Sequence, residues 1–390
     1  MKTLLFVCYN IIGDTMDSNQ KKFNLYVFLS TFSRNLIEVF IPLILYKFGY
    51  SLKEVILYYL LVNIILIILV YPCIWLSKKT SNRTLSLVGI FSFIVVQILL
   101  NNIIYDMKYI FVLSFFYSLY RIGYWLARRF YNLKVIHKKD ISNSYSLISI
   151  VNQIAIILSS YIGSLFLEFV STEVLTLISV LLFLISIIPL YKLEFNHEKN
   201  DEKIEIIKTI KRIPFRNLYI FGAYESINVT KFLFTLYLFI YVKNNYQIVG
   251  IMNIFTNLAT IIFAYFYGKK INEKDNYVKL SILFISVVYF LKANSVSYIL
   301  LVVISFLEGI ATKMYELSIS KEFYAMSKKF EYYNYNLMFE LVLSIFRTIV
   351  LFICYFFVND LKIMLYISIG LIFISSLMNF KPLREKNYKV

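Results

Sequence analysis

The chain has 390 residues, of which 59% are hydrophobic and 18% aromatic, while only 16% are charged. Soluble globular domains are about 45 to 50% apolar and about 25% charged, so this composition excludes a soluble domain, and it equally excludes disorder. The formal net charge is +17, which would suggest nucleic-acid binding in a soluble protein and must here first be compared with membrane topology.

Long apolar runs follow one another along almost the whole chain. A run of about 20 residues crosses the hydrocarbon core of a bilayer as a helix, the element that satisfies its own backbone polar groups. Twelve such runs lie near 23–46, 54–76, 85–104, 109–127, 143–167, 174–191, 217–242, 248–267, 278–295, 298–319, 336–357 and 362–380. We therefore expect an all-α membrane protein with twelve transmembrane helices in two six-helix bundles.

Lysine and arginine are distributed unevenly between the segments that connect these helices. Of the 40, 29 lie in alternate segments that include both ends of the chain, and six lie in the opposite loops. Because positively charged loops stay on the cytoplasmic side, this predicts a multi-pass protein of the bacterial cytoplasmic (plasma) membrane with both termini in the cytoplasm. The bias accounts for the net charge without nucleic acid, and it makes anionic lipid headgroups the natural partner of the basic loops.

The longest polar interruption, residues 192–216, divides the twelve helices into six and six. Within it, 205–212 have helical spacing, which fits either a short amphipathic helix on the membrane surface or a solvated tether. The first residues lack the pattern of a cleaved signal peptide, and Met16 is an alternative start to Met1. In chain order we expect a cytoplasmic tail (1–22), a bundle (23–191), a cytoplasmic linker (192–216), a second bundle (217–380) and a basic cytoplasmic tail (381–390).

Two basic turns occupy equivalent places in the two halves, 75–83 after the second helix and 267–275 after the eighth. The twelve spans, the cytoplasmic termini, the division into six and six, and these turns resemble the major facilitator superfamily over essentially the whole chain. The resemblance implies a secondary active transporter with its substrate site between two bundles, working by alternating access.

The gating turn that the superfamily carries after its second helix is only partly kept. Cys73 stands in place of its first glycine and Ser77 in place of its aspartate, so the gating ion pair of that turn does not carry over whole. What remains is a basic cytoplasmic gate loop formed by Lys78, Lys79 and Arg83.

Ionisable side chains at membrane depth cost about 2.5 to 3.5 kcal/mol each, so each one is a functional hypothesis. The twelve expected helices contain ten such side chains away from their ends. Eight of these ten lie in helices 1, 4, 7 and 10, which line the central cavity in the family that the chain resembles. The alternative is that they form buried pairs that lock helices together, for which those one or two turns apart are well placed. The predicted substrate cavity consists of Arg34, Glu38, Arg121, Lys231, Lys313, Glu316, Glu340 and Arg347.

The two remaining charges, Glu225 and Glu308, are the predicted sites of proton coupling. A buried carboxylate can bind and release a proton during a transport cycle, as coupling requires. Drug/proton antiporters of the superfamily often place an acid in helix 7 or 10 and an arginine in helix 4, and Glu225, Glu308 and Arg121 are similar to these. Helix 5 counts against that subclass, since it has Gly163 alone and no Gly-Pro pair.

The sequence therefore predicts proton-coupled efflux of a small amphipathic compound, such as a drug-like molecule, a metabolite or a peptide. The alternatives are a proton-coupled uptake symporter for a polar or zwitterionic nutrient, a lipid flippase and a non-transporting membrane scaffold. The chain has no Walker loop, HExxH or GxSxG motif, so we do not expect an enzyme, a cofactor or a metal site. The expected partners are a small-molecule substrate, protons and lipid, and we expect a monomer.

Overall fold

The computed structural model describes residues 18–135, 141–193, 203–212, 215–241, 245–267, 277–295, 297–329, 332–357 and 360–377. The choice between Met1 and Met16, the tail 381–390, and large parts of the predicted tail 1–22 and of the predicted linker 192–216 lie outside these ranges.

All regular secondary structure in the described ranges is helical. The first half consists of α2 (Ser18–Asn35), the short 3-10 helix η1 (Glu38–Phe40), α3 (Ile41–Lys47), α4 (Leu52–Lys79), α5 (Asn82–Asn101), α6 (Met107–Val135), α7 (Ile141–Phe169) and α8 (Thr172–Tyr191). The short α9 (Ile206–Arg212) precedes a second half of α10 (Phe215–Tyr241), α11 (Tyr246–Tyr267), α12 (Tyr277–Asn294), α13 (Tyr298–Lys329), α14 (Tyr332–Phe356) and α15 (Leu361–Leu377).

Each of the twelve expected transmembrane helices has a counterpart, with α2, η1 and α3 together forming the first. Within the described residues, nine helices are long and apolar enough to cross a membrane, and Leu361–Leu377 is a shorter apolar helix. Local caps define several helix starts. Ser51 and Glu54 form a capping box at the start of α4, and Ser81 and Ser171 cap α5 and α8.

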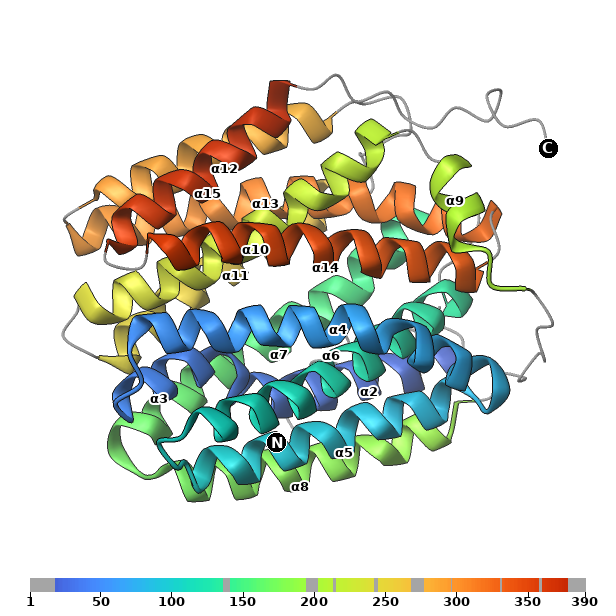
Figure 1. Ribbon diagram of the computed structural model, residues 1–390, viewed down its shortest axis with the longest axis horizontal. Helices are drawn as coiled ribbons and strands as arrows, with labels where there is room; N and C mark the ends of the chain where they lie inside the picture. Colours follow the sequence, from blue (N-terminus) through green and yellow to red (C-terminus); the bar gives the residue numbers. More distant parts are fainter. Residues whose placement is uncertain are drawn as a thin grey trace.

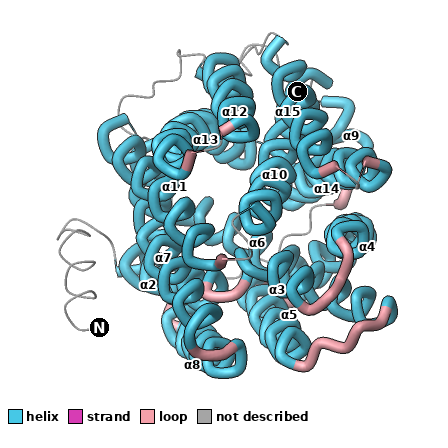
Figure 2. The backbone as a smooth tube through the Cα atoms, turned by 90° about the vertical axis from the view of Figure 1, so that its left-hand side faces the viewer, coloured by secondary structure: helices cyan, strands magenta, loops and turns pink. Residues whose placement is uncertain are grey.

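The helices form two bundles that lie side by side with their long axes roughly parallel (Figure 1). The first bundle contains α2 to α8 and the second contains α10 to α15, and Figure 2 shows both nearly end-on. The most extensive packing between them joins α4 to α14 and α7 to α11. Counted along the chain, these are the second and eleventh helices and the fifth and eighth helices. The two pairs are equivalent, because in each the second helix of one half packs against the fifth helix of the other half. The predicted fold class is confirmed.

The first expected span, near 23–46, corresponds to the candidate span Ser18–Lys47, but its α-helix is interrupted in the middle. The α-helix ends at Asn35, and α3 restarts at Ile41 with Pro42 in its first turn, where a missing N–H costs nothing. Gly163 of α7 packs directly against the break, because a Cβ built there would lie 2.5 Å from the carbonyl oxygen of Leu36. Interrupted helices in transporters occur where the backbone lines a site.

Small residues allow α7 and α11 to approach each other closely across the bundle interface. Ser159, Ser160 and Ser164 of α7 are fully buried. A Cβ built at Gly250 of α11 would lie 2.6 Å from the Ser164 hydroxyl oxygen, so a larger residue at this position would displace Ser164 and separate the helices. Buried serines therefore take the place of further glycines in letting this segment of α7 approach its neighbour.

Of the two interpretations of 205–212, the structure shows the helix, α9. It packs against α14, with the Glu205 backbone N–H donating to Asn334 Oδ1 at 2.7 Å and Thr209 buried. Because α9 lies beside one end of the helix layers in Figure 1, we call this end the linker end and the opposite end the far end.

The charge bias predicts that the linker end faces the cytoplasm. In a cysteine-free variant, a new cysteine at the exposed Lys208 of α9 should react with a membrane-impermeant maleimide only after intact cells are permeabilised. A cysteine at the exposed Lys108, in the first turn of α6 at the far end, should react in intact cells and serves as the matched control. The reverse pattern would show that the predicted orientation is wrong.

Candidate functional site

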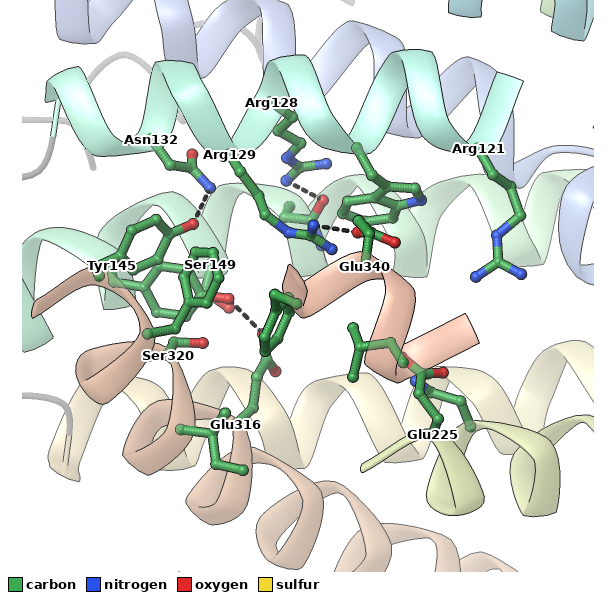
Figure 3. A pocket seen from close by; sticks show the side chains of 18 of the residues that line it. Arg121, Arg128, Arg129, Asn132, Tyr145, Ser149, Glu225, Glu316, Ser320 and Glu340 are labelled. Carbon is green, nitrogen blue, oxygen red and sulfur yellow. Dashed lines mark hydrogen bonds and ion pairs between the residues drawn. The ribbon is translucent and has the colours of Figure 1, made fainter. Parts of the chain in front are cut away.

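A cavity of about 470 Å³ lies between the two bundles and is lined by side chains of both (Figure 3). Four carboxylates and four guanidinium groups are on its wall: Glu38, Glu225, Glu316, Glu340, Arg121, Arg128, Arg129 and Arg347. Aromatic rings cover much of the remaining surface, among them Tyr117, Trp125, Tyr145, Phe323, Tyr324 and Phe339. The site is therefore both strongly charged and aromatic.

Helix α6 contributes one continuous stripe to this wall. Arg121, Trp125, Arg128 and Asn132 follow one another at intervals of three and four residues, which places them on one helix face. The sequence placed Arg128 and Arg129 among the cytoplasmic loop charges. The helix extends to Val135, however, and carries both arginines into the protein.

Arg34 and Glu38 form the expected ion pair at 3.0 Å between Nε and Oε2, across the break in the first helix. The Tyr117 hydroxyl donates to Glu38 Oε1 at 2.8 Å, and the Arg34 guanidinium stacks 4.9 Å from the Trp125 ring centroid. Glu38 lines the cavity, whereas Arg34 lies behind it. The pair therefore links the interrupted backbone to the cavity wall of α6.

Glu225 of α10 binds Arg347 of α14, with Oε2 accepting from Nε at 2.7 Å, and Asn228 donates to the same oxygen at 3.0 Å. Nη1 of Arg347 donates to Asn63 Oδ1 of α4 at 2.8 Å. A single arginine therefore connects a carboxylate of the second bundle with an amide of the first.

Glu340 of α14 forms an ion pair with Arg129 of α6, again between the two bundles. Sequence reasoning considered Glu340 and Arg347 as a pair on one helix face. The structure contradicts this pairing, since each binds a partner on a different helix. The rotation of α14, which packs against α4 and α10, decides these partners.

Lys313 and Glu316 form the expected pair within α13, at 3.0 Å. Lys313 is completely buried and also donates to the Ser149 hydroxyl of α7, while Tyr145 of α7 donates to Glu316 Oε1 at 2.9 Å. This pair thus also holds α13 of one bundle against α7 of the other.

Glu308 does not line the cavity. It is buried between α13 and α12, where it pairs with Lys292 and accepts a hydrogen bond of 2.7 Å from the Tyr289 hydroxyl. Lys292 lies near the end of the helix expected at 278–295. The structure instead buries it to 5% exposure, because its side chain turns inward toward Glu308 rather than outward to the membrane surface. Only knowledge of the helix neighbours could have shown this.

Two of the predicted charges have no ion-pair partner in the part of the chain that the structure describes. Arg121 extends into the cavity, and Figure 3 shows no interaction drawn to it. Lys231 lines a second, smaller cavity of about 50 Å³ together with polar groups that include Asn257, Thr312 and Glu316.

The two bundles contact each other on both sides of the cavity. At the linker end, Asn132 Nδ2 donates to the Tyr324 hydroxyl at 2.7 Å. At the far end, Tyr59 and Phe232 pack with ring centroids 4.3 Å apart, and the Tyr246 N–H donates to Glu168 at 3.3 Å. The structure is therefore bridged on both sides of the site.

The three predicted gate-loop residues differ in what they contact. Lys78 lies over the Tyr333 ring of the second bundle, with Nζ 5.9 Å from the centroid. Lys79 lies over Trp75 of its own helix, at 4.0 Å, and Arg83 donates to the Leu193 carbonyl oxygen at 2.9 Å. Among these three, Lys78 is the one seen to reach across the bundle interface.

Sequence comparison identifies the protein family. The family profile described as Major Facilitator Superfamily matches residues 23–380. The chain belongs to the Major Facilitator Superfamily. It is thus a multi-pass membrane transporter rather than an enzyme.

Solved structures of this superfamily resemble the chain in fold. The nucleoside transporter NupG has a TM-score of 0.68 at 12% identity, with 92% of this chain and 98% of that chain covered. The transporter FucP in its outward conformation gives 0.65 at 14% identity, covering 92% and 97%. An outward-facing bacterial homologue of the iron transporter ferroportin gives 0.67 at 11% identity, covering 93% and 98%. No curated protein matches the sequence significantly.

Proposed function

We propose that this superfamily member is a secondary active transporter that works by alternating access and couples movement of a small amphipathic compound to protons. The observation that carries the proposal is the charged and aromatic cavity between the bundles, bridged at both ends by contacts between the two halves. Opening either set of contacts alone would expose the cavity to one side of the membrane.

Glu225 is the proposed proton carrier that controls the opening of the contacts between the bundles. As an anion it holds Arg347, and Arg347 in turn binds Asn63 of the opposite bundle. Protonation would remove the charge that holds the guanidinium and so weaken a contact between the bundles. Glu308 remains the second proposed carrier, acting through Lys292 inside the second bundle.

Export is the proposed direction, in agreement with the similarity of Glu225 and Arg121 to the acid and the arginine of drug/proton antiporters. Proton-coupled uptake is the second candidate. Among the solved structures similar in fold is one titled an E. coli fucose:proton symporter, with a TM-score of 0.63 at 14% identity. The two differ in whether substrate and proton move in opposite directions or together.

Purified protein in liposomes that contain a pH-sensitive dye tests the mechanism and its direction together. Drug-like amphipathic compounds and polar nutrients are added outside, one at a time, without an initial pH gradient. We expect a transported compound to raise the luminal pH, because antiport exchanges it for an internal proton. A fall in luminal pH would indicate symport. The absence of any protein-dependent pH change over both compound classes would contradict proton coupling.

A further inference from the structure

The charges on the cavity wall and their direct partners do not balance. Four carboxylates face the cavity, and each is bound by its own cation: Glu38 by Arg34, Glu225 by Arg347, Glu316 by Lys313 and Glu340 by Arg129. Two further guanidinium groups on the same wall, Arg121 and Arg128, form no direct ion pair with a described carboxylate, and Glu38, Glu225 and Glu340 attract Arg121 only from a distance. Once Arg34 and Lys313, which lie off the wall, are counted with it, six cations face four carboxylates, an excess of two positive charges.

The surroundings of these two arginines differ. Arg128 is buried to 5% exposure and donates to neutral oxygens, at 2.8 Å to Asn152 Oδ1 and at 3.0 Å to the Tyr124 hydroxyl. Arg121 lacks a hydrogen-bond partner in the described chain and extends into the cavity (Figure 3). A cation at membrane depth that no counter-ion contacts directly is costly, so a ligand that places a negative charge against it is favoured there.

We propose that the transported compound is an organic anion whose carboxylate or phosphate group binds Arg121. The planar guanidinium offers paired N–H donors that match both groups. Arg128 lies two helical turns away on the same face of α6 and adds attraction without direct contact. This inference rests on the proposed transport function and names its substrate class.

The aromatic lining specifies the rest of this ligand. Trp125 lies between the two arginines on α6, and Tyr117 and Phe339 line the same cavity. Rings of this kind favour an apolar, preferably aromatic, body attached to the anionic group. A cationic group finds no free carboxylate here, because all four on the wall are already paired.

Tryptophan fluorescence provides a direct binding test. The chain has two tryptophans, Trp75 and Trp125, and Trp75 is 46% exposed on the outer surface of α4. A Trp75→Phe variant thus leaves Trp125 as the sole reporter, inside the cavity. Nitroaromatic compounds quench tryptophan on contact, so we would titrate 4-nitrobenzoate, 4-nitrophenyl phosphate, neutral 4-nitrobenzamide and cationic 4-nitrobenzylamine against the purified variant.

We expect at least one of the two anions to quench saturably with a Kd about tenfold or more below that of the amide, and the amine to bind most weakly. Comparison of the two anions then shows whether a carboxylate or a phosphate is preferred. Arg121→Gln should remove the difference between anion and amide, while Arg121→Lys keeps the charge and should retain part of it. Lys108→Gln, which removes a surface charge, should leave all Kd values unchanged.

Equal affinity for anion and amide, tighter binding of the amine, or no saturable quenching by either anion below about 10 mM would overturn the inference. Gel filtration of each variant establishes that it is folded, and the Lys variant keeps the test valid if the Gln variant is unstable. The assay measures equilibrium binding, so its result is independent of whether liposome experiments show transport or proton coupling.

Discussion

Glu225→Gln is expected to reduce transport driven by a pH gradient to the rate of protein-free liposomes while substrate binding persists. The amide keeps the shape of the carboxylate but cannot carry a proton, and it no longer holds Arg347 by charge. Flux is measured with and without an imposed gradient. Glu173→Gln, at an exposed position at the start of α8, is the matched control and should transport normally.

Loss of the carboxylate also leaves Arg347 buried without its counter-charge, which costs about 3 to 5 kcal/mol when one partner of a buried pair is removed. A Glu225→Gln/Arg347→Gln double variant separates the two effects, because it should recover stability but not proton-driven transport. Full proton-driven transport by the single variant would show that Glu225 is not the carrier.

Glu308→Gln provides the comparison, because Glu308 forms its ion pair inside the second bundle rather than on the cavity wall. The single variant leaves Lys292 buried without a counter-charge, and Lys292→Met should restore its folded yield. If Glu308 carries a proton, the Lys292→Met/Glu308→Gln protein should fold yet remain uncoupled. Restored coupling in the double variant would assign this pair to stability alone.

The second large effect is expected at Arg34 and Glu38. Arg34→Gln and Glu38→Gln should each lower the folded yield and the unfolding temperature in detergent, by an equivalent of about 3 to 5 kcal/mol, since each leaves a buried charge unpaired. The double neutral variant should recover most of the stability. Because Glu38 also binds Tyr117 on the cavity wall, we expect only partial recovery of transport.

A double-mutant cycle on yield, unfolding temperature and transport measures this interaction. The exposed pair Glu205 and Lys208 of the linker is the matched control, because solvent-exposed pairs contribute about 0 to 1 kcal/mol. Additive losses for Arg34 and Glu38 would show that the two groups do not interact. Full recovery of transport would instead show that the Arg34–Glu38 ion pair only stabilises the fold.

The sequence by itself determined the class of protein and its helices. Twelve apolar runs about 20 residues long could be assigned to membrane helices because backbone polar groups in hydrocarbon have almost no other way to be satisfied. The cavity could be anticipated from the rarity of charges at membrane depth, and Arg121, Glu225 and Glu316 do line it. The pairs Arg34–Glu38 and Lys313–Glu316 were visible as well, because residues one turn apart on a helix face are neighbours.

Only the tertiary structure decided which charges meet across helices. The partners of Glu308, Glu340 and Arg347 depend on the rotation and depth of each helix against its neighbours, which a single helical repeat does not specify. Lys292 and Arg128 could equally have reached the membrane surface from their positions, and packing turned both inward. That Arg121 has no direct counter-ion among the described residues is likewise a property of the assembled cavity, because it appears only once every carboxylate on the wall has been assigned to its own cation.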